Sequence, residues 1–158
     1  MMELSLTTDM AEKAKLSLNK TLNIEPDILH WYGKILVFNR KRYAFCVNTK
    51  TRFAVFFRFN SKSLAEDFKA AIEKQFSYYG LNFDSLKDED VILSLSNSRS
   101  LTSQLNTAAQ DAEYVLHRHA DSEEEFEEIL MPYNKHNLGK AGDSKDMVFA
   151  LDEMKKYY

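Results

Sequence analysis

The stretch between His30 and Phe59, HWYGKILVFNRKRYAFCVNTKTRFAVFFRF, decides the fold. Three segments in it alternate with the period of two that is typical of β-strands. Shared faces are expected for Trp31, Gly33, Ile35 and Val37, for Tyr43, Phe45 and Val47, and for Phe53, Val55, Phe57 and Phe59. The connections at 39–41 and 48–50 are too short for the crossover that parallel strands need, so the segments are predicted to form an antiparallel meander.

Two helices are predicted after the meander. The first spans 64–79 and carries an apolar stripe of Leu64, Phe68, Ile72, Phe76 and Tyr79. Its start matches a capping box formed by Ser63 and Glu66, and Gly80 is suited to end it. The second spans 98–118, and its narrow, Ala-rich apolar face includes Leu101, Leu105, Ala108, Ala112 and Val115.

The fold class expected from these elements is α+β. A small antiparallel sheet, made of the meander at 30–59 and a strand at 91–95, with 2–6 as a further candidate strand, packs against the two main helices on one face. A C-terminal helix is predicted to carry Met147, Leu151 and Met154, after a loop at 132–142. We expect one domain over 1–158, with a mobile acidic and polar segment at 119–142.

The composition restricts the function classes. The net charge of −3 gives no global attraction to nucleic acid or to acidic membranes. The single Cys46 excludes a disulfide within the chain and lies within a strand, where it is expected to be a small buried apolar residue. No N-terminal signal or membrane-spanning run is present, so a cytoplasmic location is expected. No phosphate loop or metal-ligand spacing occurs, and neither a cofactor nor a metal is predicted.

The candidate anion or polar-clamp site is the turn formed by Asn97, Ser98, Arg99 and Ser100. It leads from a strand into a helix, whose first amide groups and positive dipole favour an anion. Arg99 adds a bidentate donor. Ordinary helix capping, with Arg99 bonded to a local carboxylate or carbonyl, is the structural alternative, so the sequence leaves open whether Arg99 is structural or functional.

Two charged sets are candidate contact surfaces. The basic set is Arg40, Lys41, Arg42, Lys50 and Arg52, which the meander divides between opposite ends of its middle strand. Charged turns also keep a sheet soluble and block edge pairing, which is the structural alternative. The acidic set is Glu123, Glu124, Glu125, Glu127 and Glu128, within the run 121–128, which also fits a solvated helix face.

Several short motifs resemble a known family. They are WYGKILVFNRKRY at 31–43, NTKTRFAVF at 48–56, SNSRSLTSQLN at 96–106 and the polar segment 134–140. In this order they resemble an uncharacterised bacterial family, domain of unknown function family 6933. The chain departs from that family at Tyr43, where Cys is common, and in the acidic segment 121–128. The resemblance implies fold and extent, and it carries no activity.

The sequence favours a non-enzymatic protein-interaction or regulatory domain of a bacterium, phage or mobile element, with a protein partner preferred over nucleic acid. One alternative is a nucleic-acid-associated protein that uses the basic hairpin turns. Tight binding of nucleic acid is not expected, because the basic residues are divided and the net charge is negative. Another alternative is an anion or small-ligand binder, or an enzyme, at 97–100.

Overall fold

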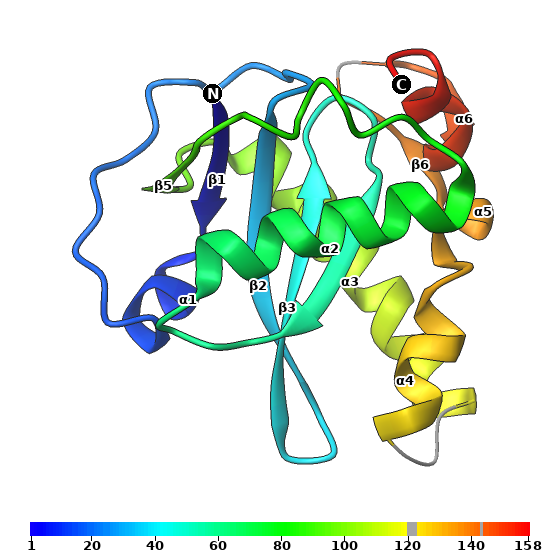
Figure 1. Cartoon of the computed structure of the whole chain (residues 1–158), viewed down its shortest axis with the longest axis horizontal. Helices are drawn as coiled ribbons and strands as arrows, with labels where there is room; N and C mark the ends of the chain where they lie inside the picture. The colour runs from blue at the N-terminus through cyan, green and yellow to red at the C-terminus, as the bar shows by residue number, and fades with distance from the viewer. Residues whose placement is uncertain (120–122, 143) are drawn as a thin grey trace.

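The computed structural model describes residues 1–119, 123–142 and 144–158, apart from the side chains of residues 119, 123 and 124. Its strands are β1 (Met2–Leu6), β2 (His30–Phe38), β3 (Lys41–Asn48), β4 (Ala54–Arg58), β5 (Val91–Leu95), β6 (Leu138–Lys140) and β7 (Met147–Phe149). Its helices are α1 (Thr8–Lys13), α2 (Leu64–Tyr79), α3 (Arg99–His119), α4 (Glu123–Leu130), α5 (Tyr133–His136) and α6 (Ala150–Lys155). Figure 1 shows their arrangement.

The main sheet has the strand order β4-β3-β2-β1-β5, which confirms the α+β fold class. The β2–β3 and β3–β4 ladders are antiparallel, so the meander is confirmed. The predicted strands at 2–6 and 91–95 are also present, but β1 pairs in parallel with both β2 and β5. The short-turn argument applies only inside the meander, whereas the long connections that contain α1, α2 and α3 leave room for crossovers.

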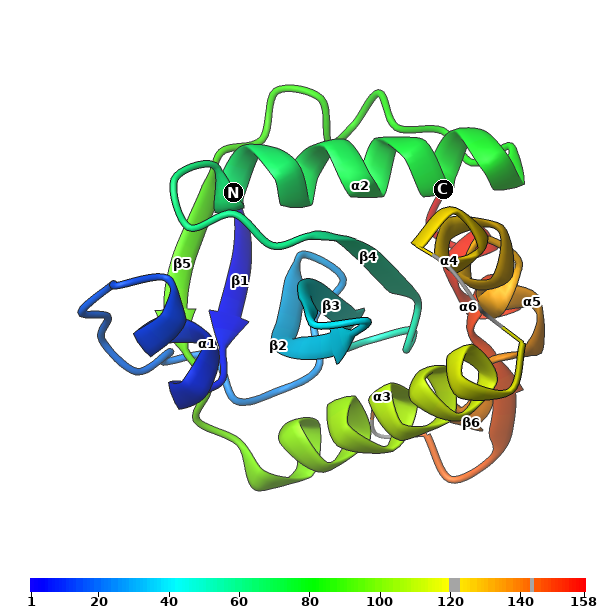
Figure 2. The same ribbon diagram turned by 90° about the horizontal axis from the view of Figure 1, so that it is seen from below.

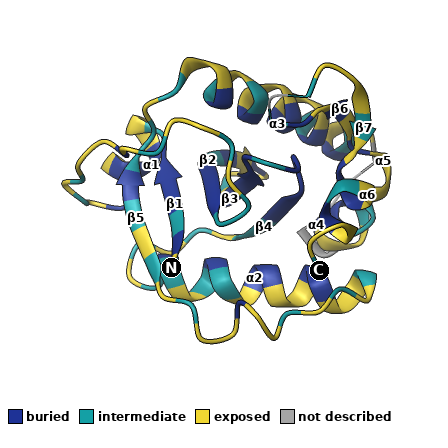
Figure 3. Cartoon of the chain, turned by 90° about the horizontal axis from the view of Figure 1, so that it is seen from above, coloured by how far each residue is buried: buried dark blue, intermediate teal, exposed yellow. Residues whose placement is uncertain are grey.

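The two faces of the sheet carry separate apolar cores. On one face Trp31, Phe53 and Val55 pack with α1, α2 and α6, and on the other Tyr32 and Phe45 pack with α3 and α4. The expectation that both main helices cover one face is therefore wrong, because α2 and α3 lie on opposite sides of the sheet (Figure 2). The alternation of the meander buries both of its faces, and α2 and α3 each turn a buried side toward the sheet (Figure 3).

Several local predictions need correction. Ser63 makes no capping hydrogen bond with the backbone of α2, and its hydroxyl donates to Asp67 Oδ2 at 2.7 Å, so the capping box with Glu66 is not formed. Gly80 ends α2 in the left-handed conformation, with φ of 72°, as predicted. The last helix begins only at Ala150, because Met147 lies in β7, and the predicted loop at 132–142 contains α5 and β6.

The β4 edge is covered by two asparagines that lie three residues apart. The amide N–H of Ala54 donates to Asn134 Oδ1 and Asn134 Nδ2 donates to the Ala54 carbonyl, both at 2.8 Å. Asn137 Nδ2 donates to the Arg52 carbonyl, and Arg52 Nε donates to Asn137 Oδ1, again both at 2.8 Å. These side chains take the place of a neighbouring strand along part of the edge, which limits its pairing with another chain.

Candidate functional site

The predicted turn at 97–100 starts a helix as expected. Ser98 Oγ accepts the amide N–H of Leu101 at 3.3 Å, so Ser98 caps α3. Asn97 joins the turn to the body of the protein, because its amide donates to Tyr32 Oη and its side chain donates to the Thr21 carbonyl. An open hollow of about 510 Å³ lies beside the turn and is lined by Ser96, Asn97, Ser98, Arg99, Thr102, Ser103 and Asn106.

Arg99 lies at the first position of α3 with an exposed side chain. It makes no hydrogen bond or ion pair with the described residues, so the expected polar clamp is not formed among them. Ser100 is also exposed. The turn therefore offers a cation to solvent, but no described contact orients the guanidinium in advance.

The predicted basic set separates as the meander requires. Arg40, Lys41 and Arg42 lie at the β2–β3 turn, while Lys50 and Arg52 lie at the opposite end of β3. Arg52 is only 5% exposed and adopts a left-handed φ of 67°. Its guanidinium is held by Asn137 and by Asp111, whose Oδ2 lies 3.4 Å from Nη2. Arg52 therefore belongs to the interior, which leaves Lys50 as the partly exposed member of the predicted set at that end.

Other cations join the β2–β3 turn from elsewhere in the chain. Nine of the described residues line an open groove of about 650 Å³, and six of them are basic: Lys13, Lys15, Arg40, Lys41, Arg42 and Arg58. They come from the end of α1, from the hairpin and from the end of β4. The local sequence pattern does not place 13–15 and 58 beside the hairpin, so these cations are not part of the predicted basic set.

The acidic set lies on α4, which is anchored by an aromatic residue. Phe126 is 1% exposed and stacks on Tyr43 with ring centroids 4.0 Å apart. The neighbouring Glu127 and Glu128 are exposed, and Glu127 Oε2 lies 2.9 Å from Lys74 Nζ. Glu125 is partly buried, while the predicted contacts Glu123 and Glu124 have side chains outside the described residues.

A buried polar cluster crosses three strands and was missed by the sequence analysis. Ser5 Oγ lies 2.7 Å from both His30 Nε2 and Ser94 Oγ, and Ser94 Oγ donates to Glu3 Oε2 at 2.6 Å. Ser5 and His30 make the contact of a nucleophile and its base. Their exposed fractions are 0% and 1%, so a substrate has no access to either group in this conformation.

The charges of this cluster follow from its burial. Burial lowers the pKa of His30 below 6.5, although Glu3 and Asp27 favour the imidazolium. Burial also acts to raise the pKa of Glu3, but hydrogen bonds from Ser94 and Thr21 and the nearby His30 outweigh it and lower that pKa. Among the described residues, His30 Nδ1 has no hydrogen-bond partner. A neutral imidazole beside a carboxylate is therefore the favoured state at neutral pH.

Neither a metal cluster nor a membrane span is found in the described part of the chain. Residues 1–119, 123–142 and 144–158 contain no group of three or more His, Cys, Asp or Glu suited to hold a metal ion. Within the same ranges, no helix is both long enough and apolar enough to cross a bilayer. Cys46 is fully buried as expected, and burial raises the pKa of its thiol far above the ordinary value.

The geometry defines a small α+β domain with open charged surfaces and an enclosed polar cluster. The chain belongs to the family described as domain of unknown function (DUF6933), whose model matches residues 3–152. This match confirms the family resemblance of the sequence motifs. No curated protein and no solved structure matches the chain.

Proposed function

We propose that this protein is a non-enzymatic interaction or regulatory domain that acts in the cytoplasm by binding a protein partner. The single observation that carries the proposal is the packing of α4 against the sheet. Its buried Phe126 fixes the helix against Phe38, Tyr43 and Phe56, while Glu127, paired with Lys74, and Glu128 are exposed. An acidic face on a fixed helix suits a basic partner surface, because less ordering is needed on association.

The enclosed cluster supports a non-enzymatic role. Ser5 and His30 have the chemistry of an acyl-transfer pair, but catalysis needs the nucleophile within reach of a bound substrate. Both groups are enclosed between the sheet and its covering segments. A bacterial, phage or mobile-element regulator is the class of protein that we favour, and its partner would be recognised by positive charge.

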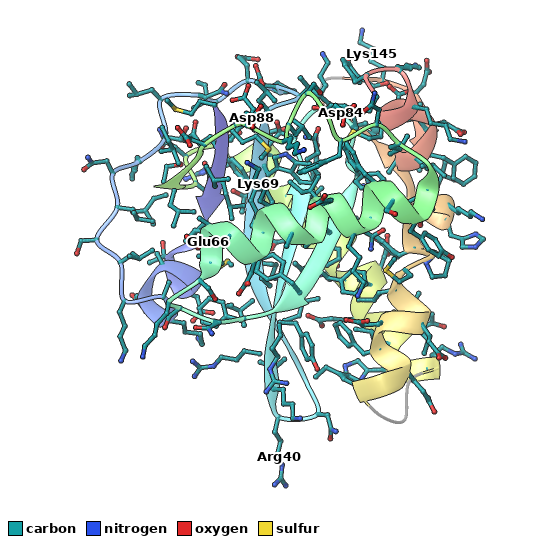
Figure 4. All side chains as sticks on the ribbon, in the orientation of Figure 1. Arg40, Glu66, Lys69, Asp84, Asp88 and Lys145 are labelled. Carbon is teal, nitrogen blue, oxygen red and sulfur yellow. The ribbon has the colours of Figure 1, made fainter. Side chains whose placement is uncertain are left out.

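The acidic face can be tested with a matched pair of double variants. Glu127→Gln with Glu128→Gln removes two charges from α4, and Asp84→Asn with Asp88→Asn removes two exposed charges from the segment between α2 and β5 (Figure 4). A basic polypeptide, such as poly-L-lysine immobilised on a sensor, serves as the probe. We expect the α4 variant to associate more slowly at low salt, with a smaller change in dissociation, and the control to behave like the wild type. Equal association rates for the two variants would contradict the proposal.

A second candidate function is anion binding at 97–100, which the exposed Arg99 beside the 510 Å³ hollow favours. Added inorganic phosphate should then raise the melting temperature of the wild type by mass action. The Arg99→Ala variant should lose that response while its melting temperature without phosphate stays unchanged, since Arg99 has no described partner to lose. An identical phosphate response in both proteins would rule out Arg99 as the ligand.

A further inference from the structure

The tip of the β2–β3 hairpin extends beyond β1 and β4 as a two-stranded ribbon, and Phe38 within it is buried against Phe126 of α4. The pairs Val37↔Arg42 and Phe38↔Lys41 lie beyond Tyr43↔Arg58, the last pair between β3 and β4. On the other side, β1 pairs with β2 only as far as Gly33. Figure 1 shows the ribbon extending past α1 and α2, and Figure 4 places Arg40 at its tip.

The groove beside this ribbon concentrates positive charge. Its six basic residues are drawn from only 21 Lys and Arg in a chain whose net charge is −3. Lys13 is paired with Asp9. Lys15, Arg40 and Arg42 are exposed and make no ion pair with the described residues. The remaining lining residues include Asn60 and Ser61, whose side chains are of the kind that also contacts phosphate oxygens.

Two of these cations occupy backbone positions that favour glycine. Arg40 follows Asn39 in a two-residue turn, and the φ angles of the two residues are 64° and 52°, as in a type I′ hairpin turn. Lys15 follows the last turn of α1 with φ of 58°. The Lys15 amide donates to the Glu12 carbonyl and the Leu16 amide to the Ala11 carbonyl, which is the Schellman motif that usually contains glycine at this position. A left-handed backbone costs Lys15 and Arg40 conformational free energy that glycine would avoid. This cost points to a use for their positive charge.

We propose that this groove and ribbon bind the phosphate backbone of a DNA duplex. Arg58 of this groove also lines a pocket with Glu127, so the site neighbours the acidic face of α4. The proposal goes beyond the protein-binding function proposed above. A two-stranded ribbon fits the major groove of B-form DNA, and Lys and Arg beside it neutralise phosphates. Single-stranded nucleic acid is less favoured, because that mode relies on a platform of several aromatic side chains, and Phe59 is the only aromatic side chain among the described residues that line the groove. Weak binding of nucleic acid was expected because the basic set is divided between the two ends of β3 and the net charge is negative, whereas the structure adds cations from the end of α1 and from β4 beside Arg40 to Arg42.

Glycine substitutions separate binding from folding. The double variant Lys15→Gly with Arg40→Gly removes two charges and relieves two left-handed positions, so we expect an unchanged or higher melting temperature together with weaker DNA binding. The control variant Lys145→Gln with Lys155→Gln removes two exposed charges elsewhere, and Figure 4 places Lys145 at the end of the molecule opposite to Arg40. Binding of a short fluorescent DNA duplex of mixed sequence is measured by anisotropy across a salt series.

The expected size of the effect follows from counterion release. If Lys15, Arg40 and Arg42 each neutralise one phosphate, the logarithm of the binding constant falls with that of salt with a slope of about −2.7, or about 40-fold between roughly 50 and 200 mM salt. Further contacts would make the slope steeper. The slope of the glycine variant should be smaller in magnitude by about 1.8, and the slope of the control variant should equal that of the wild type.

Three results would overturn the proposal. One is the absence of duplex binding by the wild type at low salt, and another is an equal slope for the glycine and control variants. The third is equal or tighter binding of poly-L-glutamate that competes with DNA, which would assign the groove to an acidic protein. Glu127 and Glu128 are unchanged in all of these proteins, so the results are read separately from the test of the acidic face. Should the glycine variant fail to fold, amide chemical-shift changes of the wild type on DNA addition must fall at 13–15, 40–42 and 58–61, and shifts confined to other residues would count against the site.

Discussion

Asn134 is predicted to stabilise the protein by taking the place of a strand beside β4. Asn134→Ala removes the acceptor of the Ala54 amide and the donor to the Ala54 carbonyl, both at 2.8 Å. Ala54 is 1% exposed and Asn134 is fully buried, so water cannot replace the side chain without a movement of α5. Each buried polar group left without a partner costs about 1–3 kcal/mol, which gives a loss of about 2–6 kcal/mol. At about 2–4 °C per kcal/mol for a domain of this size, the melting temperature should fall by at least about 4 °C.

Urea unfolding measures this loss directly. Trp31 is the single tryptophan and is 1% exposed, so its fluorescence reports the unfolding of the core between the sheet and α2. Asn106→Ala is the matched control, because Asn106 is exposed on α3 and its side-chain oxygen accepts from Lys34 Nζ at 3.2 Å. A surface change of this kind is expected to stay within about 0.5 kcal/mol.

Asn134→Asp separates pairing from packing. An aspartate has nearly the same shape and retains an acceptor for the Ala54 amide, but it turns a second oxygen toward the Ala54 carbonyl. Asn134→Asp should therefore remain clearly destabilised. The reasoning would be refuted if Asn134→Ala unfolded like the Asn106→Ala control, or if Asn134→Asp restored wild-type stability.

Three further predictions concern the core and the enclosed cluster. Phe53 is fully buried and makes edge-to-face contacts with Trp31 and Phe76, so Phe53→Ala should lower the free energy of unfolding in urea by about 3–5 kcal/mol. Phe57→Ala should lower it by less, because Phe57 is only partly buried. The reverse order would contradict the burial of the meander. The pKa of His30 is lowered below 6.5 in the folded state, so as the pH falls the imidazole of the unfolded state is protonated before that of the folded state. The contribution of the neutral ring to the free energy of unfolding is therefore complete above about pH 6.5 and is lost as the pH falls. His30→Gln should then reduce the pH slope of the unfolding free energy below about pH 6.5 by up to about 1.4 kcal/mol per pH unit, and equal slopes for both proteins would disprove the assignment. The Cys46 thiol, fully buried and with a raised pKa, should react with an aromatic disulfide reagent only on unfolding, and rapid reaction of the folded protein would show that the β3 core opens.

Local patterns in the sequence predicted the strands of the meander and the helix α2. The period of two in 30–59 identified three strands, and short connections made their antiparallel order the only one available. The stripe from Leu64 to Phe76 and the following Gly80 likewise identified α2. These signals are local, because side-chain periodicity and backbone preference act over a few residues.

The positions of the helices could not be predicted in the same way. Both faces of the meander are apolar, so α2 and α3 had two equivalent places to pack, and only the connections assigned them to opposite faces. The pairing of β1 between β2 and β5 also depends on crossovers that no local pattern specifies.

The candidate sites show the same division between sequence and tertiary structure. The sequence by itself determined that Arg40 to Arg42 lie at a hairpin turn and that a helix starts within 97–100, since both follow from neighbouring residues. Only the tertiary structure brought Lys15 and Arg58 to the hairpin, buried Arg52, and placed Asn134 along the β4 edge. Contacts between residues far apart in the chain depend on how whole layers pack, and that packing is settled by the burial of apolar faces rather than by the polar residues that the packing brings together.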